Sequence, residues 1–400
     1  MSFIKFDFNW EQRKVNEIFK ITRGQVLSVA EIEDNKSNNA PYPVYSSQTK
    51  NDGIMGYYKE FLFDTAITWT TDGANAGTVN YRKGKFYSTN VNGVLLSDIG
   101  YANKAIADAL NKVAWKYVSK VGNPKLMNNV MGEITIVLPK NIKEHKYIST
   151  FLTCMDNLIT LHQRRVELLK QIKKGYLQQM FPIDGENLPR IRFANFNENW
   201  NKRKFSNVFS FSVSNNTVSR AGLNRASGQI KNIHYGDILV KFDEIVNVDD
   251  SNIPYITDAR KEDYKNQLLC DGDIIIADTA EDKTTGKAIE LININDSSVV
   301  SGLHTVVARP DIVFAQKYLG YYLNSSCYHS QLLSLMQGIK VLSLSKKNIA
   351  KTEIVFPINV DEQVKISQSL FNLSQLINFQ QKKIKKLKNL KKAYLQQMFI

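Results

Sequence analysis

One short stretch of the sequence holds the residue types of a metal-dependent nuclease. Asp273 is followed by Glu281, Asp282 and Lys283, and carboxylates beside a lysine can hold a divalent cation and a phosphate group. That chemistry requires a strand geometry that spacing alone does not establish, and short matches of this kind are common by chance. Gly286-Lys287-Ala288 lacks the earlier glycine and the Ser or Thr of a phosphate-binding loop. The sequence therefore predicts no active site.

Basic side chains with polar and aromatic neighbours could do a different chemistry, which is contact with nucleic acid. Residues 81–85 and 283–287 each follow an expected strand and carry Lys or Arg beside Tyr or Thr. Lys and Arg bind phosphate oxygens, whereas Asn and Thr can read base edges. For any single residue a solvated loop is the alternative interpretation, and only the recurrence of such loops in both halves of the chain favours DNA. The candidate DNA-binding residues are Asn75, Tyr81, Arg82, Lys83, Lys85, Lys283, Thr284, Thr285, Lys287 and Lys340.

The overall composition is that of a basic globular protein. The 400 residues include 52 Lys and Arg against 38 Asp and Glu, which gives a formal net charge of +14. Three widely spaced cysteines form neither a disulfide framework nor a CxxC metal motif, which favours a reducing compartment. The sequence has no run of about 18 apolar residues. We therefore expect a cytoplasmic protein without a membrane partner, and its charge makes nucleic acid a candidate partner.

Most of the excess positive charge lies in two segments. Residues 158–181 carry a net charge of +4 and residues 376–400 carry +7, so only +3 remains for the rest of the chain. The two segments can attract phosphates without sequence preference, meet an acidic partner surface, or face solvent. Any reading of a DNA sequence must then come from the nearly neutral remainder of the chain.

The same two segments reveal an internal repeat. Residues 158–181 and 376–399 are identical at 13 of 24 positions without a gap, at an offset of 218, and both end in Tyr-Leu-Gln-Gln-Met-Phe. Two further borders recur: Trp10, Arg13, Lys14 and Phe19 match Trp200, Arg203, Lys204 and Phe209, and residues 136–139 match residues 354–357. The first of these borders has an offset of 190 and the second an offset of 218. The second half therefore holds 28 more residues between its borders, which is the difference between the two offsets. A period near 200 indicates a tandem domain duplication.

The repeated segments are expected to be long helices. Apolar side chains recur at alternating spacings of three and four, and the same seam position is polar in both copies. The helices could pair with each other as a two-helix coiled coil, or each could pack on its own domain. The Tyr-Leu-Gln-Gln-Met-Phe blocks could be core or a docking site for two copies of a partner. The residues assigned to the seam and the blocks are Ile159, His162, Val166, Leu169, Tyr176, Met180, Phe181, Ile377, Gln380, Ile384, Leu387, Tyr394, Met398 and Phe399.

The interiors between the repeated borders have the pattern of strands and turns. We expect strands at residues 42–45, 61–63 and 66–70, and a repeated Gly-Asp-strand phrase at residues 236–240 and 272–276. The fold class is therefore α+β: two tandem-duplicated α/β globular domains joined by two long helices that form an antiparallel coiled coil. The expected segments are 1–143 and 186–361 for the domains and 144–185 and 362–400 for the helices.

With its Trp-x-x-Arg-Lys borders at Trp10 and Trp200 and its repeated helices, the whole chain resembles the specificity subunit of type I restriction-modification systems. The resemblance implies two target recognition domains, each binding one half of a split, asymmetric double-stranded DNA sequence, with the helices acting as a ruler. It also implies that the chain is non-catalytic and holds no cofactor. Two methyltransferase subunits and the restriction/translocase subunits would bring S-adenosylmethionine, ATP and Mg²⁺. The alternatives are a self-contained DNA methyltransferase or nuclease, and a coiled-coil scaffold without DNA contact.

Overall fold

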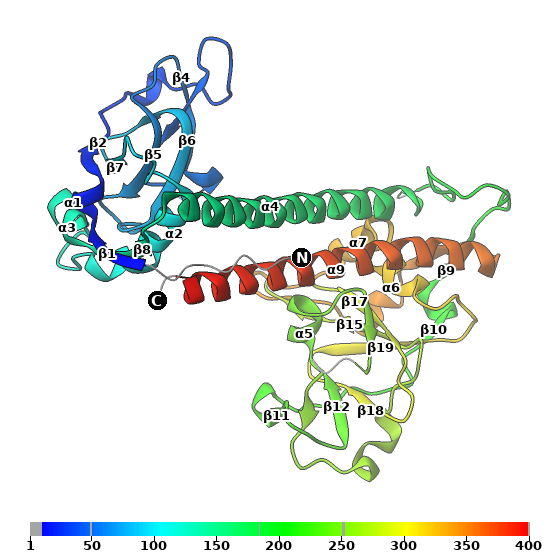
Figure 1. The fold of residues 1–400 in the computed structure, drawn as a ribbon. Helices are drawn as coiled ribbons and strands as arrows, with labels where there is room; N and C mark the ends of the chain where they lie inside the picture. Colours follow the sequence, from blue (N-terminus) through cyan, green and yellow to red (C-terminus); the bar gives the residue numbers. More distant parts are fainter. Residues whose placement is uncertain (1–9, 49, 184, 250–252, 399–400) are drawn as a thin grey trace. The chain divides into compact units, whose positions relative to one another are not determined.

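The computed structural model describes residues 10–48, 50–183, 185–249 and 253–398, which form two compact units (Figure 1). The first unit contains residues up to 164 and residues from 381 onward, and the second contains residues 165–380. Two long helices, α4 (Ile142–Gln179) and α9 (Val360–Met398), contribute one part each to both units. No helix in the described ranges is long and apolar enough to cross a membrane.

The first globule, which is the part of the first unit outside α4 and α9, is built on a six-stranded sheet. Its strand order is β2-β7-β5-β6-β3-β4, and β1 and β8 form a separate antiparallel pair. The strands and helices are β1 (Trp10–Lys14), α1 (Val15–Ile18), β2 (Lys20–Arg23), β3 (Tyr42–Tyr45), β4 (Ile54–Tyr58), β5 (Phe63–Thr70), β6 (Val79–Ser88), β7 (Asn92–Leu96), α2 (Lys104–Val113), α3 (Asn128–Glu133) and β8 (Thr135–Pro139).

The second globule is larger and contains a five-stranded and a four-stranded sheet, besides the two-stranded pairs β16–β20 and β9–β21. The strand orders of the two larger sheets are β10-β19-β15-β17-β13 and β11-β14-β12-β18. The strands and helices are β9 (Asn201–Lys204), β10 (Phe209–Ser210), β11 (Leu223–Asn224), β12 (Ile230–Ile233), α5 (Tyr235–Val240), β13 (Ile245–Asn247), β14 (Tyr255–Ile256), β15 (Ile274–Ala277), β16 (Thr279–Ala280), β17 (Ala288–Ile292), β18 (Ser298–Ser301), β19 (Thr305–Pro310), α6 (Tyr318–Leu323), α7 (Ser326–Leu333), β20 (Leu342–Ser343), α8 (Lys346–Ile349) and β21 (Glu353–Phe356).

Both globules share a frame of five strands. The order β2-β7-β5-β6-β3 in the first matches β10-β19-β15-β17-β13 in the second, and in both the first three pairings are antiparallel and the last is parallel. The helix that follows the second strand of the frame, α2 after β7 and α6 after β19, is hydrogen-bonded to the frame through an asparagine in both globules. Asn111 of α2 accepts a hydrogen bond from Val79 N at 2.9 Å, and Asn324 accepts one from Ala288 N at 3.1 Å. The duplication seen in the sequence therefore extends to interiors whose residues no longer match.

The repeated borders meet in each globule. Arg13 pairs with Ile136 in the β1–β8 ribbon, and Arg203 pairs with Ile354 in the β9–β21 ribbon. The two borders have different offsets because they are the two ends of one globule, and only the chain between them differs in length. The four-stranded sheet of the second globule lies within this longer interior.

Alternating side chains on β5 and β6 separate an apolar face from a polar face. Ile67, Trp69 and Val79 join the hydrophobic core that also contains Ile106 and Leu110 of α2. The opposite face carries Thr68, Thr70, Thr78, Asn80 and Arg82, next to a small apolar cluster that includes Ala66 and Val94. In the second globule the corresponding face is apolar, and residues such as Ile275 and Ile289 are covered by α5 and the added sheet.

Two local predictions are wrong. Residues 236–240, expected as a strand, form α5, because Ile238 packs into the second core and the buried Asp237 is held by Arg220 and Lys241 at 2.6 Å each. Residues 61–63 do not form a strand of their own, since β5 begins at Phe63 and continues to Thr70. The strands expected at 42–45 and 272–276 are confirmed as β3 and β15, the latter beginning at Ile274.

Candidate nucleic-acid interface

A turn at the end of the central strand pair is the first candidate element. In the first globule, Gly77 N donates to Thr70 O at 2.9 Å and Thr70 N donates to Thr78 O at 3.0 Å. In the second, Gly286 N donates to Ala277 O at 2.8 Å and Ala277 N donates to Lys287 O at 2.9 Å. Both glycines have positive φ values, 83° and 89°, which a residue with a side chain rarely adopts. We call residues 71–78 and 278–287 the turn loops.

A second loop packs against each turn loop. Ser119 and Lys125 exchange two backbone hydrogen bonds, of 2.8 and 3.1 Å, and Gln337 and Ser343 exchange two of 3.0 and 2.8 Å. The residue after each loop then bonds to the turn loop, Leu126 N to Thr71 O and Leu344 N to Asp278 O, both at 2.8 Å. We call residues 119–125 and 337–343 the tip loops. Each globule thus presents one turn loop joined to one tip loop by equivalent bonds.

The structure brings most candidate residues of the second globule together in this loop pair. Lys283 and Thr284 are exposed on the turn loop, and Lys340 is exposed on the tip loop. The side chains of Thr285 and Lys287 point inward instead. Thr285 is fully buried and donates to Asp282 O at 3.0 Å, and Lys287 Nζ donates to Phe242 O at 2.8 Å. Of the candidate residues in this globule, Lys283, Thr284 and Lys340 are therefore the ones with exposed side chains.

The electrostatics of the second turn loop follow from its internal hydrogen bonds. The side chain and backbone N–H of Thr284 both donate to Asp282, and these bonds lower the pKa of the Asp282 carboxyl group. Burial lowers the pKa of the Lys287 amine, against the nearby Glu244. Within the described residues no group of three or more His, Cys, Asp and Glu side chains could hold a metal ion. Asp273, considered above as a ligand, is buried and bound by Arg309 at 2.7 Å.

The candidate residues of the first globule lie in several places. Asn75 is on the turn loop, where its amide donates to Ser47 O at 3.0 Å. Lys83 and Lys85 are exposed on β6, with Lys85 Nζ 4.5 Å from the centroid of the Phe61 ring. Tyr81 points into the hydrophobic core, because strand alternation puts it on the apolar face, and burial raises its pKa. We therefore do not assign Tyr81 to DNA contact.

Arg82 is a buried structural cation. Its side chain is 3% exposed, and its guanidinium carbon lies 3.8 Å from the centroid of the Tyr45 ring. Nη1 donates to the Asp52 backbone oxygen at 2.7 Å and to its carboxylate at 3.2 Å, and Nε donates to Thr68 Oγ1 at 3.3 Å. Burial lowers the pKa of Arg82, an effect opposed by Asp52. The buried guanidinium is therefore paired with the exposed carboxylate of Asp52, and Arg82 holds the loop of Asp52 against the sheet.

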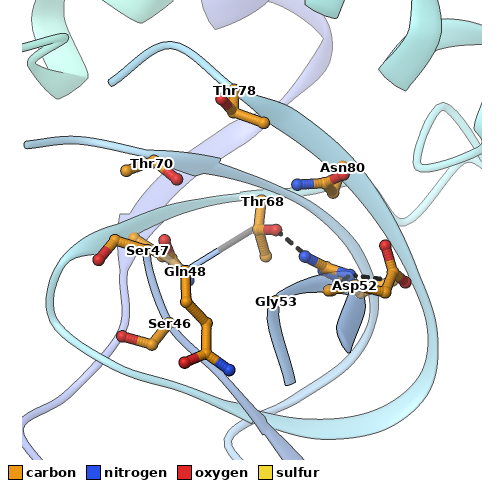
Figure 2. A pocket seen from close by; sticks show the side chains of 11 residues that line it. Ser46, Ser47, Gln48, Asp52, Gly53, Thr68, Thr70, Thr78 and Asn80 are labelled. Carbon is orange, nitrogen blue, oxygen red and sulfur yellow. Dashed lines mark hydrogen bonds and ion pairs between the residues drawn. The ribbon is translucent and has the colours of Figure 1, made fainter. Parts of the chain in front are cut away.

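Arg82 forms part of a small polar pocket on the open face of the sheet (Figure 2). The cavity has a volume of about 90 Å³, and residues 46–48 and 52–53 close one side of it. Its sheet-borne lining consists of Thr68, Thr70, Thr78, Asn80, Arg82 and Asn92. Within the described part of the chain, the side chains of Thr70, Thr78, Asn80 and Asn92 make no hydrogen bond to another residue. Thr70 and Asn92 are buried, so ordered water is the partner that fits them. Thr78 and Asn80 are half-buried and can hydrogen-bond either water or a base edge.

Sequence reasoning missed these four residues, although a signal was present. Residues 67–70 read Ile-Thr-Trp-Thr, in which apolar and polar side chains alternate. That pattern predicts one core face and one open polar face, and the open face is where a binding site can form. The search for basic residues beside aromatic ones selected Tyr81, which lies on the opposite face.

A family model described as the type I restriction modification DNA specificity domain matches residues 8–171 and, a second time, residues 197–389. Together the two matches cover most of the chain. The chain belongs to this family.

Individual relatives agree with the family assignment. The MjaVIII specificity subunit of Methanocaldococcus jannaschii is 23% identical over 417 residues, covering 97% of this chain and 91% of that protein. The MpnII specificity subunit of Mycoplasma pneumoniae is 39% identical over 133 residues, which are 32% of this chain and 39% of that protein. Matches to the M. pneumoniae relatives span 39 to 66% of those proteins' own length. The crystal structure of the S subunit from M. genitalium has the same fold, with a TM-score of 0.67 at 13% identity, covering 100% of this chain and 98% of that one.

In this member of the specificity family, the repeated Tyr-Leu-Gln-Gln-Met-Phe blocks pack into the cores. In the second unit, the buried Met180 and Phe181 join a core with Trp200, Ile366 and Leu370. In the first unit, Leu395 and Met398 pack with the equivalent residues, Trp10, Ile148 and Leu152. Of the two tyrosines, Tyr176 is exposed and Tyr394 stacks edge-on against Phe151 at 5.0 Å. Phe399 lies outside the described residues.

Each block therefore completes the unit that holds the other globule. The block at 176–181 follows the first globule in sequence but belongs to the second unit, and the block at 394–398 follows the second globule but belongs to the first. Within the first unit the helices run antiparallel, because Phe151 contacts Tyr394 whereas Asp156 pairs with Lys391. The repeated tryptophans and the repeated blocks recur together because each packs on the other.

The residues predicted for the heptad seam form the more buried side of α4 and α9. Ile159, Val166 and Ile377 are buried, and Leu169, Ile384 and Leu387 are half-buried. The polar seam residues His162 and Gln380 are also buried. Other apolar side chains of both helices are exposed, and they match across the repeat: Leu158 with Leu376, Leu161 with Phe379, and Ile172 with Leu390.

Proposed function

We propose that this chain is the DNA-sequence-specificity subunit of a type I restriction-modification system. Each globule binds one half of a split, asymmetric double-stranded DNA target. Helices α4 and α9 pair as an antiparallel coiled coil that sets the distance between the half-sites. The target recognition domains are residues 1–143 and 186–361, and the spacer helices are residues 144–185 and 362–400. The chain acts in the cytoplasm and is non-catalytic, so partner subunits carry out methylation and cleavage.

One observation carries this proposal: the two globules keep the same frame and the same loop pair but change the side chains on them. The hydrogen bonds that close the turn loops and tip loops are equivalent, whereas the residues between them differ. The pocket of Thr70, Thr78, Asn80 and Asn92 has no polar equivalent on the second frame, where the same face is apolar. Constant scaffolds with variable loops suit the reading of two different half-sites, which a symmetric DNA-binding dimer does not do.

The repeated helix surfaces support the partner part of the proposal. The exposed apolar pairs Leu158/Leu376, Leu161/Phe379 and Ile172/Leu390 recur at the same repeat positions. Two copies of one partner require two copies of one surface, and these pairs provide it. We therefore propose that two methyltransferase subunits dock on the helices and that the restriction/translocase subunits join this assembly. The lysine-rich part of α9 beyond Gln380 can also contact DNA phosphates without sequence preference.

The decisive experiment is methylome mapping of a host that carries this chain together with a methyltransferase subunit. We expect methylation at a split sequence with two unlike half-sites and a fixed spacer, and no methylation when this chain is deleted. Purified chain that methylates or cleaves DNA without partners would instead establish an enzyme. If the methylome is unchanged when the chain is deleted, the chain does not direct methylation and a scaffold role without DNA contact remains.

A further inference from the structure

Each tip loop projects one almost fully exposed aliphatic side chain from between its closing hydrogen bonds. Val121 is 91% exposed and Ile339 is 99% exposed, and they occupy the same position between equivalent closing hydrogen bonds. A single exposed aliphatic side chain on a protein surface is ordinary. Here a β-branched aliphatic residue stands at the same place in two loops whose other four positions all differ. This recurrence indicates that both tips contact a similar partner.

The neighbours of the two tips indicate what that partner is. Lys120 precedes Val121, and Lys340 follows Ile339, so each tip places a cation beside its aliphatic side chain. Neither tip loop contains an acidic residue. Lysines can bind phosphates on either side of a groove, while aliphatic groups contact the thymine methyl group or pack between base steps.

We propose that the tip loops are the elements of each globule that enter a DNA groove. Val121 and Ile339 are the apolar anchors common to both. The other positions of residues 120–124 and 338–342 select the bases of each half-site. This inference rests on the proposed function and names the residues that carry out its recognition step.

A protein partner fits the tip loops less well than DNA does. Two copies of the same partner subunit would need the same residues on both globules, as the helix surfaces provide. The tip loops instead share their closing hydrogen bonds and one residue type, and a lysine moves from one side of the anchor to the other. Different half-sites of one DNA duplex need this combination, because the groove is common and the bases are not.

The first test replaces each anchor by aspartate in the complete complex with its methyltransferase subunits. Val121→Asp and Ile339→Asp should each weaken binding of duplex target about tenfold or more, because an apolar contact is lost and a carboxylate faces phosphates. Val26→Asp and Val313→Asp are matched controls, since these valines are 77% and 82% exposed on the same globules but outside the tip loops. Val121→Ile should keep the wild-type affinity.

The outcomes separate this inference from the proposed function. If wild-type complex reads no split target, the proposed function fails whatever the variants do. If wild type reads one but Val121→Asp binds as well as Val26→Asp, the tip is not a DNA contact. If Val121→Asp complex no longer assembles with methyltransferase subunits, the tip is a partner contact and the inference is overturned. Unchanged thermal unfolding of both variants is expected, because neither side chain packs in a core.

A loop exchange tests the reading role of the flanking positions. Residues 120–124 are replaced by the sequence of residues 338–342, which fits between the same closing hydrogen bonds at the same length. We expect the methylome to change bases of the first half-site while the second half-site and the spacer stay the same. A methylome identical to wild type, or one that changes in both half-sites, would overturn the assignment.

Discussion

Phe181→Ala tests whether the end of α4 is part of the second core. Phe181 is 1% exposed, and its ring meets Tyr318 and Tyr322 of α6 edge-on, at centroid distances of 5.9 and 5.6 Å. The hydroxyl of Tyr322 in turn accepts a hydrogen bond from Val355 N of β21 at 2.8 Å. Removing the ring therefore opens a cavity between the helix end, α6 and the border ribbon.

The magnitude follows from the burial of this side chain. Truncation of a fully buried Phe to Ala costs about 3–5 kcal/mol, because transfer and cavity terms add. Domains of this kind have total stabilities of about 5–15 kcal/mol, so the second core would lose a large fraction of its stability. Tyr176→Ala is the matched control in the same repeated block. Because Tyr176 is 39% exposed, its truncation should cost less than about 1 kcal/mol.

Hydrogen exchange measured by mass spectrometry is the suitable assay, because it reports each unit separately. In Phe181→Ala, amides of α6 and β21 should exchange roughly two to four orders of magnitude faster. Amides of β5 and α2, in the first globule, should keep their wild-type rates. The reasoning is refuted if α6 and β21 exchange within a few-fold of wild type, or if both globules accelerate equally.

Four further predictions follow from other parts of the structure. Lys391→Met should destabilise the first unit by about 1.5–3 kcal/mol, the contribution of a hydrogen bond between charged groups, because Lys391 lies 2.6 Å from Asp156 and 3.3 Å from the largely buried Asp108. A double-mutant cycle with Asp108→Asn, read by exchange of α2, should recover only part of this loss, because Lys104 also pairs with Asp108. Burial raises the pKa of Glu290 to about 7, so the folded chain holds a proton there that the unfolded chain releases near its ordinary pKa of about 4.5. Stability should therefore fall as pH rises from about 4.5 to 7, and urea unfolding of Glu290→Gln should show a flatter pH profile across this window. Arg82→Lys should loosen the segment of Asp52, which limited proteolysis between residues 46 and 54 would detect; equal cleavage of both proteins would contradict its holding role. Inserting one heptad in α4 and one in α9 should lengthen the helices by about 10.5 Å and the spacer by about 3 base pairs, and an unchanged spacer in the methylome would refute the ruler.

The fold was predictable from the sequence where the pattern was long or repeated. The regular apolar spacing predicted a long helix at residues 144–185, and α4 spans Ile142–Gln179. The repeated borders predicted two equivalent globules, and the border ribbons and shared frame confirm their equivalence. Short phrases were less informative. The Gly-Asp-aliphatic phrase begins a strand at Ile274 but a helix at Ile238. The difference lies in the tertiary contacts, because Ile274 pairs within the five-stranded sheet whereas Ile238 packs in the core that covers it.

The candidate site was only partly predictable. Lys283, Thr284 and Lys340 lie together on exposed loops, whereas Lys287 was expected beside them and points inward. Residue type alone did not separate these lysines, because burial depends on which loop residue the backbone turns toward the protein. No sequence signal marked the tip loop at Val121, because a single valine between Lys and Gly is ordinary. Its equivalence to Ile339 becomes visible only from the closing hydrogen bonds of the two loops.

The sequence by itself determined the duplication, the long helices and the location of the positive charge, because these properties depend on residues that are near in the chain or repeated along it. Only the tertiary structure decided which block completes which unit. Met180 packs beside Trp200, while Met398 packs beside Trp10, although each block follows the other globule in sequence. It also decided that Arg82 is buried and paired with Asp52, and that Val121 and Ile339 project from the protein. These outcomes depend on contacts between residues far apart in the chain, which spacing does not encode.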